Sequence, residues 1–189
     1  MVAAMALKRT TSRIGEALAN APLVKPRSLR AQIKELGGVK AAAAIAGRSV
    51  SSVYRWLSGK NKPSASAKGA LDTATSDFQA SQQYRRSKLA LGREKRFRTK
   101  GAKITVHGMS GPAIDSPKKS VTIKYRRIIN QHLSAEGMAD IIDAWLQDGD
   151  EAALERLRDV MASDYLALHS PEVAEYGWEF ETIDLIKFT

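Results

Sequence analysis

Residues 39–59 read V-K-A-A-A-A-I-A-G-R-S-V-S-S-V-Y-R-W-L-S-G, and this stretch decides the fold that we expect for the first half of the chain. It predicts two short helices joined by one tight turn. The first helix is dense in alanine, whose small side chain lets a neighbouring backbone approach closely. Gly47 can make the turn because glycine adopts a positive φ at little cost. Ser49 is a favoured N-cap residue, so we expect the second helix to begin there.

The helix that begins at Ser49 has two different faces. Val53, Trp56 and Leu57 fall on one face at helical spacing and can pack into a core. The opposite face carries four other side chains, Val50, Ser51, Tyr54 and Arg55. We therefore expect one face to be buried and the other to meet solvent or a ligand.

An alanine-rich helix, a glycine turn and a serine-capped helix are together typical of the helix-turn-helix of phage-repressor type. The alternative is a plain helical hairpin, because two short helices joined by glycine share half of this pattern. One residue departs from the pattern. Arg48 follows the turn glycine, where a buried aliphatic residue is usual, and we expect the turn to be packed differently as a result.

Further helices flank this pair. Ser28 can cap a helix that ends at Gly37 and Gly38, and a fourth helix is expected from Pro63 and Ser64. The fourth helix has three side chains that can pack back on the others, Leu71, Ala74 and Phe78. With a short helix expected over residues 6–18, we assign residues 1–82 to one helical domain.

The second half of the chain changes its periodicity. Alternating apolar residues predict strands at 104–106 and 121–125, joined by a loop over 108–119. Helices are expected to begin at Ile128 and near Met138, and a third to be capped by Asp150. The tail, residues 176–188, alternates well enough for one or two more strands. Residues 104–189 are thus predicted to form a small β-sheet packed with helices, which makes the chain an α+β protein with an all-helical N-terminal domain.

Charge divides the chain more sharply than its net value of +10 indicates. Residues 1–127 hold 27 of the 30 Lys and Arg but only 6 of the 20 Asp and Glu, a net charge of +21. Residues 128–189 have a net charge of −11. A basic front and an acidic rear are typical of a protein whose first part faces a polyanion. An anionic membrane would need a basic helix with large apolar anchors, which the sequence lacks.

Residues 83–103 form the most basic segment, which we interpret as a helical linker between the two domains. Residues 85–103 hold nine bases and one acid, Glu94. Like charges at this density repel one another unless an anion lies beside them, so we expect the segment to lie along nucleic-acid phosphates. The alternative is a solvated helix face or flexible linker. Across the chain we expect phosphate contacts from Lys40, Arg48, Lys60, Lys62, Arg85, Arg86, Lys88, Arg93, Lys95, Arg96 and Arg98.

We expect bases to be read by five residues at the start of the helix, because the exposed N-terminal face of a recognition helix is what reaches the base edges of the major groove. These residues are Ser49, Val50, Ser51, Tyr54 and Arg55.

The sequence contains no recognisable active site. There is no cysteine, and the histidines at 107, 132 and 169 stand apart without the spacing of metal ligands. No phosphate-binding glycine loop is present. We therefore expect no cofactor, no metal and no catalysis by the chain itself. We also expect a cytoplasmic, nucleoid-associated protein, because no apolar run reaches the length of a membrane span.

Read in full, the chain resembles the telomere terminal proteins, the Tpg family, of linear actinobacterial chromosomes and plasmids. The likeness begins with S-R-I-G-E-A-L-A-N-A at 12–21 and includes the helix-turn-helix pattern and the basic stretch after it. It continues with G-A-K-I-T-V at 101–106 and ends with E-F-E-T-I-D-L-I-K-F at 179–188.

This resemblance implies that the chain binds telomeric DNA, together with a telomere-associated protein and a DNA polymerase. It also implies protein priming, in which a side-chain hydroxyl attacks the α-phosphate of a deoxynucleotide and stays joined to the DNA end. Such a step needs an exposed hydroxyl beside cations, with metals supplied by the polymerase. The family's priming hydroxyl lies in the region of the predicted loop, where Ser110 and Ser116 are the candidates. Both can equally be ordinary loop serines.

Two other functions are compatible with the same features. One is a transcriptional regulator, or a plasmid or phage partition-replication protein, that binds an operator-like site as a dimer through its C-terminal domain. The other is a nucleoid protein without sequence preference, which fits less well because Val50 and Tyr54 stand at base-reading positions.

Overall fold

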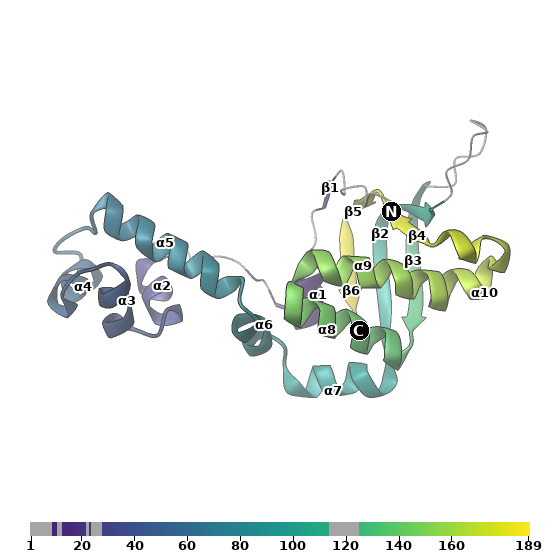
Figure 1. The fold of residues 1–189 in the computed structure, drawn as a ribbon, viewed down its shortest axis with the longest axis horizontal. Coiled ribbons are helices and arrows are strands. Elements are labelled where there is room, and N and C mark those ends of the chain that lie inside the picture. The colour runs from purple at the N-terminus through teal and green to yellow at the C-terminus, as the bar shows by residue number, and fades with distance from the viewer. Residues whose placement is uncertain (1–8, 11–12, 22, 24–27, 114–124) are drawn as a thin grey trace. The chain divides into compact units, whose positions relative to one another are not determined.

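The structure is a computed structural model, and it describes residues 9–10, 13–21, 23, 28–113 and 125–189. The chain is α+β and divides into two compact units. Residues 23–85 make one, here called the helical unit, and residues 1–22 with 86–189 make the other, here called the sheet unit. Figure 1 shows the elements of both units. Of the helices that the structure describes, none has the length and apolar character needed to cross a membrane.

The helical unit is built from α2 (Leu29–Glu35), α3 (Val39–Ile45), α4 (Val50–Leu57) and α5 (Ala65–Gln79), followed by α6 (Gln82–Lys88), which crosses the boundary into the other unit. Serine caps begin three of these helices. The side chains of Ser28, Ser49 and Ser64 each accept a hydrogen bond from a backbone N–H in the first turn, which satisfies a group that has no partner within the helix.

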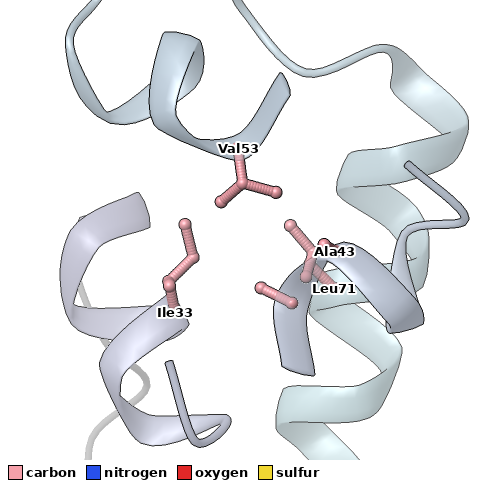
Figure 2. Close-up of a cluster of buried hydrophobic side chains, with 5 residues drawn as sticks. Ile33, Ala43, Val53 and Leu71 are labelled. Atoms are coloured by element: carbon pink, nitrogen blue, oxygen red, sulfur yellow. The ribbon is translucent and has the colours of Figure 1, made fainter. Parts of the chain in front are cut away.

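The core of the helical unit lies where the four helices α2 to α5 converge. Figure 2 shows Val53 of α4 pointing toward Ile33 of α2, Ala43 of α3 and Leu71 of α5. Val53 and Leu71 are 0% exposed. Two polar side chains of this unit are buried, Gln32 and Thr75, and both are hydrogen-bonded. Gln32 donates to Asp72 at 2.9 Å and to Thr75 at 3.0 Å, and so joins α2 to α5.

The sheet unit is organised around β2 (Ala102–Pro112). This strand pairs antiparallel with β3 (Tyr125–Leu133) on one side and with β4 (Trp178–Phe180) and β6 (Leu185–Phe188) on the other. A second small sheet pairs β1 (Arg9–Thr10) parallel to β5 (Thr182–Ile183). In β2 the even-numbered residues from Ala102 to Pro112 are buried, so this strand turns one face to the core of its unit.

Helices cover that buried face. They are α1 (Ile14–Ala19), α7 (Leu91–Lys100), α8 (Ala135–Asp148) and α9 (Asp150–Met161), with a π-helical turn η1 (Ala162–Leu166), the short α10 (Ala167–His169) and η2 (Pro171–Tyr176) after them. In Figure 1 α8 and α9 pass in front of the strands β2, β3 and β6. The largest fully buried side chains include Phe97, Ile104, Trp145, Leu157 and Phe180, so each of these helices and strands except the shortest contributes to one core.

The start of the predicted loop at residue 108 and the predicted helix at Ile128 are wrong, while residues 114–119 of that loop lie outside the described residues. Residues 108–112 continue β2, and residues 128–133, expected to begin a helix, are the second half of β3. Ile128, Ile129 and Leu133 have a spacing that either element can use. The strand forms because Ile129 and Leu133 are then buried while each residue pairs across β2, as Ile129 does with Val106. The predicted strand over 121–124 lies outside the described residues.

The N-terminal boundary of the expected helical domain also differs. Helix α1 belongs to the sheet unit, where Ile14 and Leu18 are buried. Residues 9–10 are a strand rather than part of that helix. Asp150 does not cap α9, since Gly149 is its N-cap residue. The Asp150 carboxylate instead accepts a hydrogen bond from the backbone N–H of Gly15 at 2.9 Å, which holds the start of α1.

Gly15 could not be replaced without moving this contact. A Cβ at Gly15 would lie 2.3 Å from Nε1 of Trp145. Glycine is therefore required at this position so that α1 can lie against the Trp145 side chain of α8.

We expect Leu71→Ala to destabilise the helical unit by about 2–5 kcal/mol, because it leaves a cavity in a closed core. Hydrogen exchange of the backbone amides of α2 to α5 measures this loss of stability. Leu91→Ala is the matched control, since Leu91 is 75% exposed and its loss should change stability by no more than about 0.5 kcal/mol. Equal exchange rates in the two variants would contradict the core described above.

Candidate nucleic-acid interface

The turn between α3 and α4 is closed by backbone hydrogen bonds. Gly47 has a φ of +60°, and its N–H donates to Ala44 at 3.2 Å. The N–H of Arg48 donates to the carbonyl of Ala43 at 2.9 Å. The Arg48 side chain is exposed. The turn thus needs no buried aliphatic residue at this position, and the arginine stands on the surface beside the start of α4.

The N-terminus of α4 is built as its sequence predicts. Ser49 has extended backbone angles, and its hydroxyl accepts from the N–H of Ser52 at 3.2 Å. The cap leaves Ser49 itself exposed at the start of the helix.

The two predicted faces of α4 are confirmed by burial. Val53 is completely buried, and Trp56 and Leu57 are half-buried against the core. On the other side Val50 is 39% and Tyr54 is 59% exposed, and Ser51 and Arg55 are exposed with them. An apolar and an aromatic side chain are therefore held in water by a helix whose other face is fixed in a core.

The surface around α4 is basic. From residue 36 to residue 71 the chain has six bases and no acid. The predicted phosphate-contacting residues of this unit, Lys40, Arg48, Lys60 and Lys62, are all exposed. Sequence reasoning missed Arg30 of α2. Arg30 lines a hollow together with Tyr54, Leu57 and Ser58. Only the packing of α2 against α4 brings this cation to Tyr54, and no spacing in the sequence signals it.

The basic segment after α5 divides into bases with protein partners and bases that face solvent. In α7, Glu94 is 6% exposed and lies between two arginines. Nη1 of Arg86 donates to both carboxylate oxygens at 2.6 and 2.7 Å, and Nε of Arg98 donates at 3.0 Å. Arg98 also pairs with Asp143 of α8. These three arginine and carboxylate pairs join α6, α7 and α8.

The pKa values in this network follow from its contacts. Burial alone would raise the pKa of Glu94, but hydrogen bonds and charge from Arg86 and Arg98 outweigh it and lower the pKa. The hydrogen bond from Arg98 is the largest influence on Asp143 and lowers its pKa. The same bond raises the pKa of Arg98. Glu94, Asp143 and Arg98 are therefore charged at neutral pH.

Arg93 is also engaged with the protein. Its guanidinium donates to the carbonyls of Leu18 and Ala17 at the end of α1 and to the carbonyl of Phe188 in β6. Burial, and then the nearby charge of Arg96, lower its pKa. Arg93 thus holds α1 and β6 together, which is a structural task rather than the phosphate contact expected for it.

The remaining predicted phosphate contacts of the segment have different surroundings. Arg85 is half-buried and donates to the carbonyl of Ala80 at 2.6 Å, and Lys88 is half-buried. Lys95 and Arg96 are exposed on α7, and the guanidinium of Arg96 lies over the ring of Phe97. The structure thus leaves Lys95 and Arg96 as the clearest solvent-facing cations among the predicted contacts of the segment.

One of the two candidate priming serines, Ser110, is not displayed on a loop. Ser110 lies in β2, is 1% exposed, and its hydroxyl has no hydrogen-bond partner among the described residues. It therefore lacks the exposure that a priming hydroxyl needs. Ser116 lies outside the described residues. Within the described part of the chain, no group of three or more His, Cys, Asp or Glu side chains is placed to hold a metal ion.

Comparison with known proteins gives no match, whether to a family model, a curated protein or a solved structure. The function must therefore be argued from the surfaces described above.

We expect Glu94→Gln to lower the free energy of unfolding of the sheet unit by about 1.5–3 kcal/mol at neutral pH, because two arginines lose a charged acceptor. The lowered pKa means that the stabilisation is present above the ordinary glutamate pKa of 4.5 and is lost as the pH falls below it. The difference between the wild type and the variant should therefore shrink in acid.

Urea unfolding followed by circular dichroism, at neutral pH and below pH 4.5, measures both effects. Lys95→Gln serves as the control, since Lys95 is exposed on the same helix. A Glu94→Gln variant as stable as this control at neutral pH would show that the network contributes nothing.

Proposed function

We propose that the chain is a sequence-specific DNA-binding protein in which α3, the turn at residues 46–49 and α4 form a helix-turn-helix. The observation that carries the proposal is the two-faced α4. Its apolar face is locked into a core by Val53, while Val50, Ser51, Tyr54 and Arg55 are exposed on the opposite side. A rigid helix that presents side chains at its N-terminal half is what enters a major groove.

The charge of the helical unit supports DNA as the ligand. Six bases and no acid lie between Glu35 and Asp72. Phosphate contacts position a protein on DNA but carry no sequence information, whereas side chains at base edges do. In this proposal Lys40, Arg48, Lys60 and Lys62 contact phosphates. Ser49, Val50, Ser51, Tyr54 and Arg55 read bases, and Arg30 adds a cation beside Tyr54.

The experiment selects binding sites from a random duplex library with the full chain, and then repeats the measurement with Tyr54→Ala and Arg55→Ala. Arg55→Ala should cost about 1–3 kcal/mol on the selected site if it contacts a guanine, and should relax the preference at that position. Tyr54→Ala should relax the base preference at a neighbouring position of the selected site.

Lys34→Ala is the matched control for Arg55→Ala, since it removes an exposed cation from α2. It should keep the selected sequence. If both α4 variants select the same site with the same affinity as the wild type, the assignment of α4 is wrong.

We also propose, on the sequence resemblance, that the DNA is the end of a linear replicon. The burial of Ser110 counts against that serine as the priming hydroxyl, which leaves Ser116 as the candidate. The second candidate function is a regulator or partition-replication protein that uses the same α4 on an operator-like site. The two functions differ in one chemical event, the covalent attachment of a nucleotide.

Incubation of the chain with a labelled deoxynucleotide, a telomeric template and a cognate polymerase tests this event. The terminal-protein function predicts label on a serine or threonine, and predicts that Ser116→Ala loses the label while Ser110→Ala retains it. A known terminal protein labelled under the same conditions is the positive control. Absence of label in the chain would favour the regulator.

A further inference from the structure

The outward side of α7 is a row of cations. Glu94 and Phe97 are buried and Arg93 and Arg98 are half-buried, so this side of the helix faces its own unit. The residues between them are exposed. They are Lys95, Arg96, Thr99 and Lys100, which recur at the spacing of one helix face.

A second basic surface lies on the sheet. The odd-numbered residues of β2 from Lys103 to Met109 alternate with the buried ones and are exposed or half-buried. Because pairing is in register, they share their face with the exposed even-numbered residues of β3 and with Leu185 and Lys187 of β6. We call this the open face of the sheet.

The open face carries cations in each of its three main strands. Lys103, Arg126 and Lys187 are exposed, and His107 and His132 lie among them. Two acids are among the described residues that face this side: Asp184, which pairs with Arg126 at 2.6 Å, and the half-buried Glu179, which stands opposite Gly111 of β2. The exposed apolar residue is Ile128, at 65%. The aromatic residues of β4 and β6 are buried on the opposite face of the sheet. They are Trp178, Phe180 and Phe188.

The two surfaces adjoin at the end of α7. Nε2 of His132, on the open face, lies 3.0 Å from the carbonyl oxygen of Lys100. Gly101 makes the junction with a φ of +71°, and a Cβ there would meet the carbonyl of Leu133. The cations of α7 are thus continuous with Lys103 at the start of β2.

The helices that cover the other face have the opposite charge. Helices α8 and α9 expose one arginine, Arg156, while Arg158 is half-buried, and they expose seven acids, Glu136, Asp140, Asp143, Asp148, Glu151, Glu155 and Asp159. Within the sheet unit, exposed acids are therefore concentrated on α8 and α9, whereas the open face and the outward side of α7 carry more cations than acids.

We propose that the open face and the outward side of α7 form a second nucleic-acid contact, which binds the phosphodiester backbone without regard to sequence. The proposal rests on nucleic acid being the ligand of the chain, as proposed above, but concerns residues outside the helical unit. Charge complementarity identifies the ligand. A membrane would need several large apolar anchors beside the cations, whereas these surfaces expose two apolar side chains, Leu91 of α7 and Ile128 of β3, against six cations. Single-strand binding by stacking would need Trp, Tyr or Phe side chains, which neither surface displays among its described residues.

Contact through phosphate alone predicts binding to both duplex and single strands. Each cation that neutralises a phosphate releases counterions, so the logarithm of the binding constant falls with the logarithm of the salt concentration by about 0.9 per contact for duplex and about 0.7 for a single strand. The slope of this salt dependence therefore measures the number of phosphate contacts that the surface makes.

The test uses the full chain with Tyr54→Ala and Arg55→Ala as background, so that α4 no longer contributes. In this background Lys95, Lys100 and Lys187 are replaced by glutamine. The matched control replaces three exposed cations elsewhere, Arg13, Lys34 and Arg156, by glutamine. Fluorescence anisotropy measures binding to a short duplex and to a single strand of the same arbitrary sequence over a range of salt.

The expected result is a salt slope less negative by about 2.7 for the duplex and about 2 for the single strand, since three contacts are lost. The control should keep the slope of the background chain. Because all six side chains are exposed, the two variants should melt at the same temperature as the background.

Equal slopes in the variant and its control would overturn the proposal. So would unchanged nucleic-acid binding combined with lost binding to vesicles of phosphatidylcholine and phosphatidylglycerol, which would assign the surface to a membrane. Failure of the α4 assignment is read separately, from the sequences selected by the single Tyr54 and Arg55 variants, and does not alter these slopes.

Discussion

A carboxylate buried in protein needs cations around it, and Glu94 has them in Arg86 and Arg98. Much of the sheet unit's arrangement depends on this contact. It turns one side of α7 inward, where Arg98 continues the network to Asp143 of α8. The other side of α7 is then left with Lys95, Arg96 and Lys100 in solvent. The single acid of this basic segment thus engages two of its arginines in the fold, while Lys95, Arg96 and Lys100 remain exposed.

The helical unit is an insertion between two helices of the sheet unit. Helix α1 precedes it and packs with α9 and β6, and α7 follows it and packs with α8, so both helices belong to the sheet unit. Arg93 makes this closure, because one guanidinium binds the last carbonyls of α1 and the end of β6. The N–H of Gly15 on Asp150 adds a second attachment. The insertion is therefore connected at both ends to the same folded core.

The two units use charge in different ways. In the helical unit the bases surround α4, whose exposed side chains supply shape and hydrogen bonding as well as charge. In the sheet unit the cations spread over a flat face, and Ile128 is its exposed apolar residue. A protein that reads sequence through one surface and holds backbone through another can find a site and stay near it, because phosphate contacts are sequence-independent.

The sequence by itself determined the helical unit and the faces of α4. Its signals are local there: serine caps, glycine turns and an apolar repeat act within a few residues, so Ser49, Val53 and Tyr54 could be placed without tertiary contacts. It also predicted the α+β class and the strand at 104–106. The same reasoning failed at Ile128, because a short apolar run fits a helix or a strand until its pairing partner is known.

Only the tertiary structure decided which bases are accessible. Arg93, Lys95 and Arg98 look alike in a run of nine bases, and their burial depends on α1, α8 and β6, which lie far away in the chain. The open face likewise combines Lys103, Arg126 and Lys187 from three strands whose register no local pattern specifies. Contacts between distant segments set both outcomes, since burial and pairing are properties of the packed chain rather than of any stretch of it.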